Sequence, residues 1–64
     1  MKIGEIWNDK EDGTKVKIID IYFDKDFRND VVKIEIVNDD VGFSISRTDF
    51  LKAYEKQYGS FYGK

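Results

Sequence analysis

The segment between residues 14 and 23 constrains the fold of this chain most strongly, because its alternation of apolar residues changes phase in the middle. Val16 and Ile18 stand at even positions of the alternation, whereas Ile19, Ile21 and Phe23 stand at odd positions. Side chains alternate between the faces of a strand, so a phase change requires a bulge or bend near Ile18 and Ile19. A long bent strand shared by two halves of a sheet allows a small barrel to close. The alternative is a flat sheet with this strand at its centre, buried on both faces.

Polar breaks divide the rest of the chain into further strands. They lie at residues 8–13, 24–30 and 38–40 and consist mainly of Asn, Asp and Gly, which favour turns. β-Branched and aromatic residues gather between these breaks, which is the pattern of strands. The sequence therefore predicts a mainly β fold, a four- to five-stranded antiparallel SH3-like barrel or curled sheet. We expect its strands at about residues 2–8, 14–23, 31–37 and 41–46.

The C-terminal part changes to helical spacing. Ser46 and Asp49 match a capping box, with a hydroxyl first and a carboxylate three residues later. An apolar stripe at helical spacing follows, and it predicts one helix over about residues 47–58 that packs on the sheet. Its members are Phe50, Leu51, Tyr54 and Tyr58. Residues 59–64 show no period, and we expect a mobile tail there.

The expected core draws on the aromatic residues, of which the chain has ten: one Trp, four Tyr and five Phe. We place Trp7, Phe23, Phe43, Phe50 and Tyr54 in it. The single domain of 64 residues has a thin core and little volume for an enclosed site.

The chain contains neither Cys nor His, and this excludes several kinds of chemistry. Disulfides, thiolate–zinc sites and the usual base of a serine or cysteine nucleophile are all missing. The acidic segment 24–35 resembles a calcium-binding loop, but Arg28 and Asn29 occupy positions that the loop requires for a ligand and a glycine. We therefore expect no enzyme, no metal and no cofactor.

Charge and hydropathy indicate the environment and the partners. The net charge is −2, which disfavours a nucleic-acid binder without forbidding one. No apolar stretch approaches the ~20 residues of a membrane span, and the N-terminus lacks the apolar region of a signal peptide. A cytoplasmic protein with no membrane partner is expected; its oligomeric state is not predicted.

Two groups of residues are candidates for partner binding. In an up-and-down meander the first and third loops lie at the same end of the sheet. The carboxylates of these loops would then lie together and could attract the basic surface of a partner. These are Asp9, Glu11, Asp12, Asp39 and Asp40. Hairpin loops also favour Asp and Asn because these residues stabilise turns. Turn formation is therefore the alternative explanation of these carboxylates. Tyr22, which points away from its apolar neighbours, and Phe27, within a polar loop, are the expected aromatic anchors.

Four short motifs resemble those of small uncharacterised proteins of low-GC Gram-positive bacteria and their phages. They are Lys2-Ile3-Gly4-Glu5-Ile6-Trp7, Asp12-Gly13, Val16-Lys17-Ile18 and Phe50-Leu51-Lys52-Ala53-Tyr54. The resemblance implies an SH3-like small barrel and an accessory protein of phage or mobile-element origin. Many such proteins inhibit a host protein by binding it directly.

The sequence thus predicts a protein-binding module, an inhibitor or adaptor, whose partner is a host or other protein with a basic surface. The alternative is a nucleic-acid-binding small barrel with a basic strand face on which Tyr22 stacks against bases. That face consists of Lys15, Lys17, Lys33 and Arg47.

Overall fold

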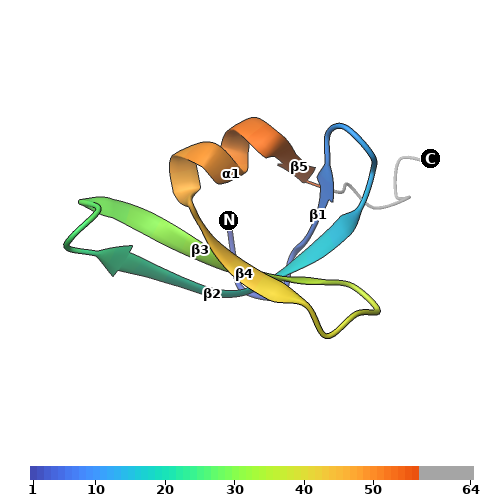
Figure 1. The fold of residues 1–64 in the computed structure, drawn as a ribbon, viewed down its shortest axis with the longest axis horizontal. Helices are drawn as coiled ribbons and strands as arrows, with labels where there is room; N and C mark the ends of the chain where they lie inside the picture. The colour runs from blue at the N-terminus through green and yellow to red at the C-terminus, as the bar shows by residue number, and fades with distance from the viewer. Residues whose placement is uncertain (57–64) are drawn as a thin grey trace.

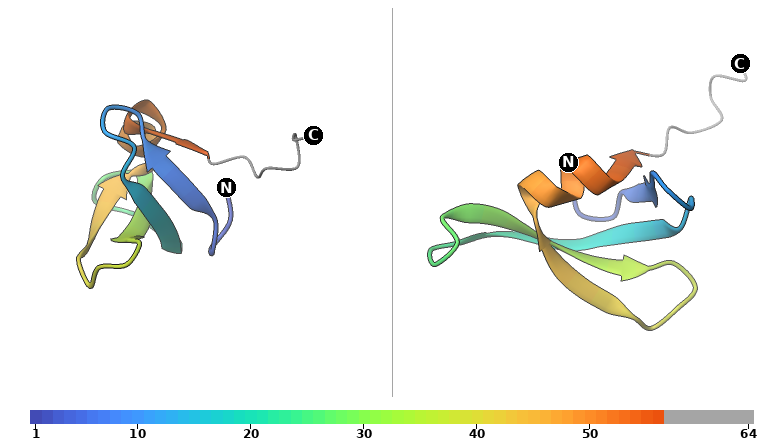
Figure 2. Two further views of the ribbon diagram at one scale, coloured as in Figure 1. Left: turned by 90° about the vertical axis from the view of Figure 1, so that its right-hand side faces the viewer. Right: turned by 45° about the horizontal axis from the view of Figure 1, so that its top comes forward.

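The computed structural model describes residues 1–56, which form five antiparallel strands in one sheet and a single short helix (Figure 1). The elements are β1 (Ile6–Asp9), β2 (Lys15–Asp24), β3 (Asn29–Ile36), β4 (Gly42–Ser46), α1 (Arg47–Ala53) and β5 (Tyr54–Lys56). The strand order is β4-β3-β2-β1-β5, so β4 and β5 are the two edges of the sheet. The mainly β class is confirmed. Figure 2 shows the curl of the sheet, with α1 lying across one face of it.

A β-bulge in β2 accounts for the phase change in the sequence. Ile18 pairs with Ile34 but Asp20 pairs with Lys33, which leaves Ile19 as the extra residue. An extra residue bends a strand and increases its twist. Because of this bulge, Val16 and Ile18 before it and Ile21 after it all pack in or against the same core. The predicted bend at Ile18 and Ile19 is confirmed.

The core lies between the curled sheet and α1. Phe50 is completely buried at its centre, and its ring centroid lies 4.8 Å from that of Trp7 and 4.9 Å from that of Tyr54. The other buried members are Val16, Ile18, Val32 and Ile34. Ser46 caps α1, as predicted, and its hydroxyl accepts a hydrogen bond from the Asp49 N–H at 3.2 Å.

Three predicted core or packing positions are wrong. Phe23 is 62% exposed, because this end of β2 extends past β1 and pairs there only with β3. Phe43 faces the same side as buried Ile34, but β4 is an edge strand and Phe43 is exposed. Leu51 is exposed on α1 although it was expected to pack on the sheet.

The predicted helix is too long. α1 ends at Ala53, and Tyr54 adopts an extended backbone, with φ −126° and ψ 152°. Tyr54 then begins β5, where it pairs with Asp9, so backbone bonds to β1 replace further helical turns. Tyr54 is nevertheless buried, as expected. The remaining predicted helical positions, 57 and 58, and the predicted mobile tail, 59–64, lie outside the described residues.

Glu5 joins the N-terminal segment to β5 at the edge of the core. Its carboxylate accepts hydrogen bonds from the Lys2 N–H at 2.9 Å and the Trp7 indole N–H at 3.2 Å. It also pairs with the Lys56 ammonium on β5, with 2.9 Å between the nitrogen and the oxygen. The Lys56 contact, followed by the Lys2 N–H, lowers the pKa of Glu5 from 4.5 to about 2.

We predict that Phe50→Ala removes most of the stability of the protein. Truncation of a fully buried Phe costs about 3–5 kcal/mol, which is close to the whole free energy of unfolding of many small domains. Urea or thermal unfolding measures the loss. Leu51→Ala is the matched control on the same helix, and because Leu51 is exposed it should cost less than ~1 kcal/mol. Equal losses in the two variants would contradict this account of the core.

We also predict that Glu5→Gln changes the pH dependence of stability. The pKa of Glu5 is lowered on folding, so its stabilisation is complete above pH 4.5 and is lost as the pH falls toward 2. The variant should be less stable than the wild type at pH 6 by ~2 kcal/mol, allowing for screening at Lys56, and the two should converge near pH 2. Urea unfolding at several pH values measures the difference. Glu55→Gln, the same change at an exposed position of β5, is the control and should alter stability at pH 6 by less than ~0.5 kcal/mol.

Candidate binding groove

The outer face of the sheet, opposite the core, carries an open groove at the end formed by the β2–β3 hairpin. Its floor contains Val31, which is 3% exposed yet lies outside the main hydrophobic cluster. Val31 pairs with Tyr22 on one side and Ser46 on the other, so these side chains form one cross-strand row. The groove has a volume of about 470 Å³. It is lined by Tyr22, Phe27, Asn29, Val31, Ser44, Ile45, Ser46 and Asp49.

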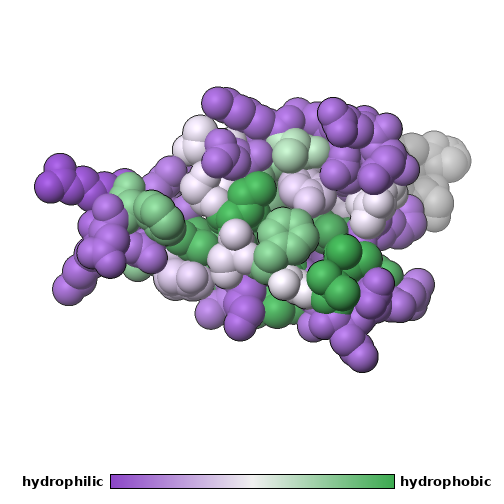
Figure 3. Space-filling model, viewed as in Figure 1, coloured by the Kyte–Doolittle hydropathy of each residue, from purple (hydrophilic) through white to green (hydrophobic). Residues whose placement is uncertain are grey.

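The two predicted aromatic anchors meet in this groove. Tyr22 is 42% exposed and Phe27 is 72% exposed. The hairpin loop that carries Phe27 is ordered by Asp24, whose carboxylate accepts the N–H of Asp26 at 2.8 Å and of Phe27 at 3.2 Å. Arg28 then turns the chain with a left-handed φ of 53°. The loop therefore holds an apolar ring at the surface, and Figure 3 shows apolar side chains gathered over this hairpin and over β4.

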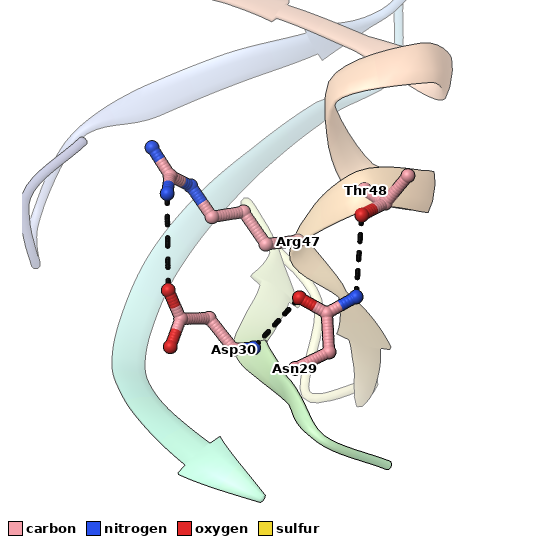
Figure 4. Close-up of polar contacts among 4 residues, drawn as sticks. All are labelled: Asn29, Asp30, Arg47 and Thr48. Carbon is pink, nitrogen blue, oxygen red and sulfur yellow. Dashed lines mark hydrogen bonds and ion pairs between the residues drawn. The ribbon is translucent and has the colours of Figure 1, made fainter.

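Polar contacts hold the helical side of the groove against the hairpin (Figure 4). The Asn29 amide donates to the Thr48 hydroxyl at 3.2 Å, while its carbonyl oxygen accepts the Asp30 N–H at 2.8 Å. Arg47 and Asp30 form a long, half-exposed ion pair at 3.8 Å. These contacts set the first turn of α1, and with it Asp49, beside the aromatic residues. No local sequence pattern predicts that Asn29 and Asp49 line a groove, because their places in it depend on contacts between distant segments.

The five predicted steering carboxylates lie at the opposite end of the sheet. The β1–β2 and β3–β4 loops share that end, as the meander predicted, and the Val37 N–H donates to the Lys15 carbonyl between them at 3.0 Å. Asp9 ends β1, Glu11 and Asp12 follow it in the β1–β2 loop, and Asp39 and Asp40 are in the β3–β4 loop. The structure therefore separates the predicted charges from Tyr22 and Phe27.

Several of these carboxylates have local structural roles. The Asp9 and Asp12 carboxylates accept the N–H groups of Glu11 at 2.7 Å and Thr14 at 2.8 Å. The bonds from Thr14 lower the pKa of Asp12. Burial, then the nearby charges of Asp9 and Asp12, raise the pKa of Tyr54. Turn geometry thus explains part of the acidic composition of this end.

Asp9 and Glu11 also line a smaller groove of about 350 Å³. Its other lining residues, Lys10, Lys52 and Ala53, bring positive charge among the acids. Lys10 crosses to α1, where its ammonium donates to the Leu51 carbonyl at 3.2 Å. This surface is of mixed charge and is not a uniform acidic patch.

The predicted basic strand face is likewise mixed. Lys17 stands directly opposite Glu35, and Lys33 directly opposite Asp20, on the outer face of the sheet. Arg47 forms its ion pair with Asp30 at the hairpin. Opposite charges on neighbouring strands reduce the local potential that would attract a phosphate backbone.

No protein-family model, curated protein or solved structure matches the chain. Among residues 1–56, no helix is long and apolar enough to cross a membrane. The same part of the chain holds no group of three or more acidic side chains placed to bind a metal ion.

We predict that Asn29 and Thr48 are energetically coupled, because their hydrogen bond joins the hairpin to α1. A double-mutant cycle of Asn29→Ala and Thr48→Ala, measured by urea unfolding, should give a coupling energy of ~0.5–1 kcal/mol. Asn29→Ala also removes the hydrogen bond that the Asn29 side chain accepts from the Asp30 N–H. This loss is the same in the single and the double variant, so it cancels in the cycle. Strictly additive losses would show that the contact does not hold the two elements together.

Proposed function

We propose that this chain is a small, non-catalytic protein-binding module that contacts its partner through the groove at Tyr22 and Phe27. The observation that carries the proposal is that two exposed aromatic residues line the same groove as Val31, a buried apolar residue outside the main core. Aromatic side chains over a partly desolvated pocket are the usual anchors of protein interfaces. Phe27 is 72% exposed and is not part of the core cluster, so packing in the core does not account for it.

The architecture we propose is SH3-like. Supporting it are the strand order, with the last strand beside the first, and the bulged β2 that pairs with both β1 and β3. The helix immediately before β5 covers the side of the sheet where the core lies. A small barrel of this kind presents loops and an outer strand face for binding.

For the partner, we propose a protein with a basic surface, and for the chain a role as an inhibitor or adaptor of phage or mobile-element origin. The origin rests on the sequence resemblance alone. The basic partner is supported by the net charge of −2 and by the carboxylates at the end away from the groove. Charges outside a contact mainly change the association rate, whereas buried aromatic anchors govern dissociation.

A nucleic-acid partner is the competing class. It is less well supported, because Lys17 and Lys33 stand opposite acidic residues on the outer face. Nucleic-acid binding also has a distinct signature, a steep loss of affinity with increasing salt.

The test is to capture the partner from a lysate of the cells that encode the chain, identify it, and measure the affinity of the purified pair. We predict that Tyr22→Ser and Phe27→Ser each weaken binding by about tenfold or more, mainly through faster dissociation. Phe23→Ser is the matched control, since Phe23 is adjacent to Tyr22 and exposed on the opposite face of β2. Circular dichroism confirms that each variant is folded.

Two results would overturn the proposal. Equal losses in Phe23→Ser and Tyr22→Ser would show that the groove is not the contact. Recovery of nucleic acid alone, with a steep salt dependence, would favour the competing class.

A further inference from the structure

The edge of β4 next to the groove is open to an added strand. Within residues 1–56, β4 pairs with β3 alone. The Ile36 N–H donates to the Val41 carbonyl at 2.9 Å, and antiparallel ladders alternate, so the backbone groups of Gly42 and Ser44 point toward the free edge. Gly42–Ser46 contains no charged residue or proline, which are the features that commonly protect an edge from pairing.

This edge and the groove are continuous. Ser44 and Ser46 line the groove, and Ser46 lies in the same cross-strand row as Val31 and Tyr22. An extended segment added beside β4 would place every second side chain on the outer face, next to that row. In this mode of recognition, backbone bonds hold the segment and the pocket selects one of its side chains.

The lining of the groove defines the side chain that fits. Two aromatic residues and two serines are among its lining residues, and Asp49 is the one charged residue among them. Within residues 1–56 the Asp49 carboxylate has no hydrogen bond or ion pair, although its N–H is held by Ser46. A cation is attracted by aromatic faces and by a carboxylate, whereas an acidic side chain would be repelled by Asp49.

We propose that the groove binds an arginine or lysine side chain of an extended partner segment that pairs, through its backbone, with the free edge of β4. This inference rests on the proposed function and adds the chemistry of the ligand. The aromatic rings of Tyr22 and Phe27 contact the aliphatic stem and the cation, and Asp49 neutralises its charge. Asn29 is a positioning residue, because it bonds to the first turn of α1 that carries Asp49.

The test is a selection of random linear heptapeptides displayed on phage against the whole chain. The expected result is enrichment of Arg or Lys at one position, flanked by residues of high strand propensity. In the selected peptides, replacing the basic residue by Gln should reduce affinity by about tenfold, as measured by calorimetry. Asp49→Asn should cause a similar loss, and the two changes together should cost little more than either one.

Asp39→Asn is the charge-matched control, because Asp39 lies at the opposite end of the sheet and has the same side chain. It should leave affinity within twofold of the wild type. The edge contact has its own readout: slowed amide exchange at Gly42 and Ser44, lost when the peptide backbone is N-methylated at the pairing positions.

Three results would overturn the proposal: no peptides selected, peptides without a basic position, or equal losses in Asp39→Asn and Asp49→Asn. Dimerisation through β4 with no peptide bound would assign the edge to a second copy instead. If the captured partner still requires Tyr22 and Phe27 but not Asp49, the cation inference fails while the protein-binding function stands.

Discussion

The β-bulge at Ile19 is the constraint on which the rest of the structure depends. A straight β2 would put Val16 and Ile18 on one face and Ile21 on the other. With one extra residue, all three pack in or against a single core, and the sheet curls enough for α1 to cover it. The same bend separates the part of β2 that pairs with β1 from the longer part that pairs only with β3. The hairpin that carries the groove lies beyond this bend, where β2 pairs only with β3.

The helix connects the core to the groove. Phe50 fills the centre of the core between Trp7 and Tyr54, which fixes the position of α1 over the sheet. The residue just before Phe50, Asp49, lines the groove. Asn29 and Thr48 join this turn to the start of β3. Packing in the core and geometry at the surface are thus linked within a few residues, so core substitutions are expected to affect binding as well as stability.

Two ends of the sheet differ in chemistry. The end with Asp9 and Asp39 is rich in carboxylates, but their neighbours include lysines, and several carboxylates cap turns. The other end combines exposed aromatic rings, a buried apolar floor and one carboxylate without a partner among the described residues. Both ends carry a groove, but the one at the hairpin is larger and is the one lined by aromatic rings. For this reason the proposed contact lies there, and the distant charges are proposed to act through their field.

The sequence by itself determined the class of fold, the bulge, the helix cap at Ser46, and the exposure of Tyr22 and Phe27. Each of these follows from local patterns: the period of apolar residues, a capping hydroxyl, and aromatic residues out of phase or within a polar loop. The tertiary structure decided where the chain stops being helical, because Tyr54 gains backbone bonds to β1 that no local pattern encodes. It also decided that Phe23 and Phe43 are exposed, since burial depends on how far the neighbouring elements extend. Contacts between distant segments separate the acidic loops from the aromatic residues and place Asp49 and Tyr22 on the same groove, which is why only the folded chain reveals these arrangements.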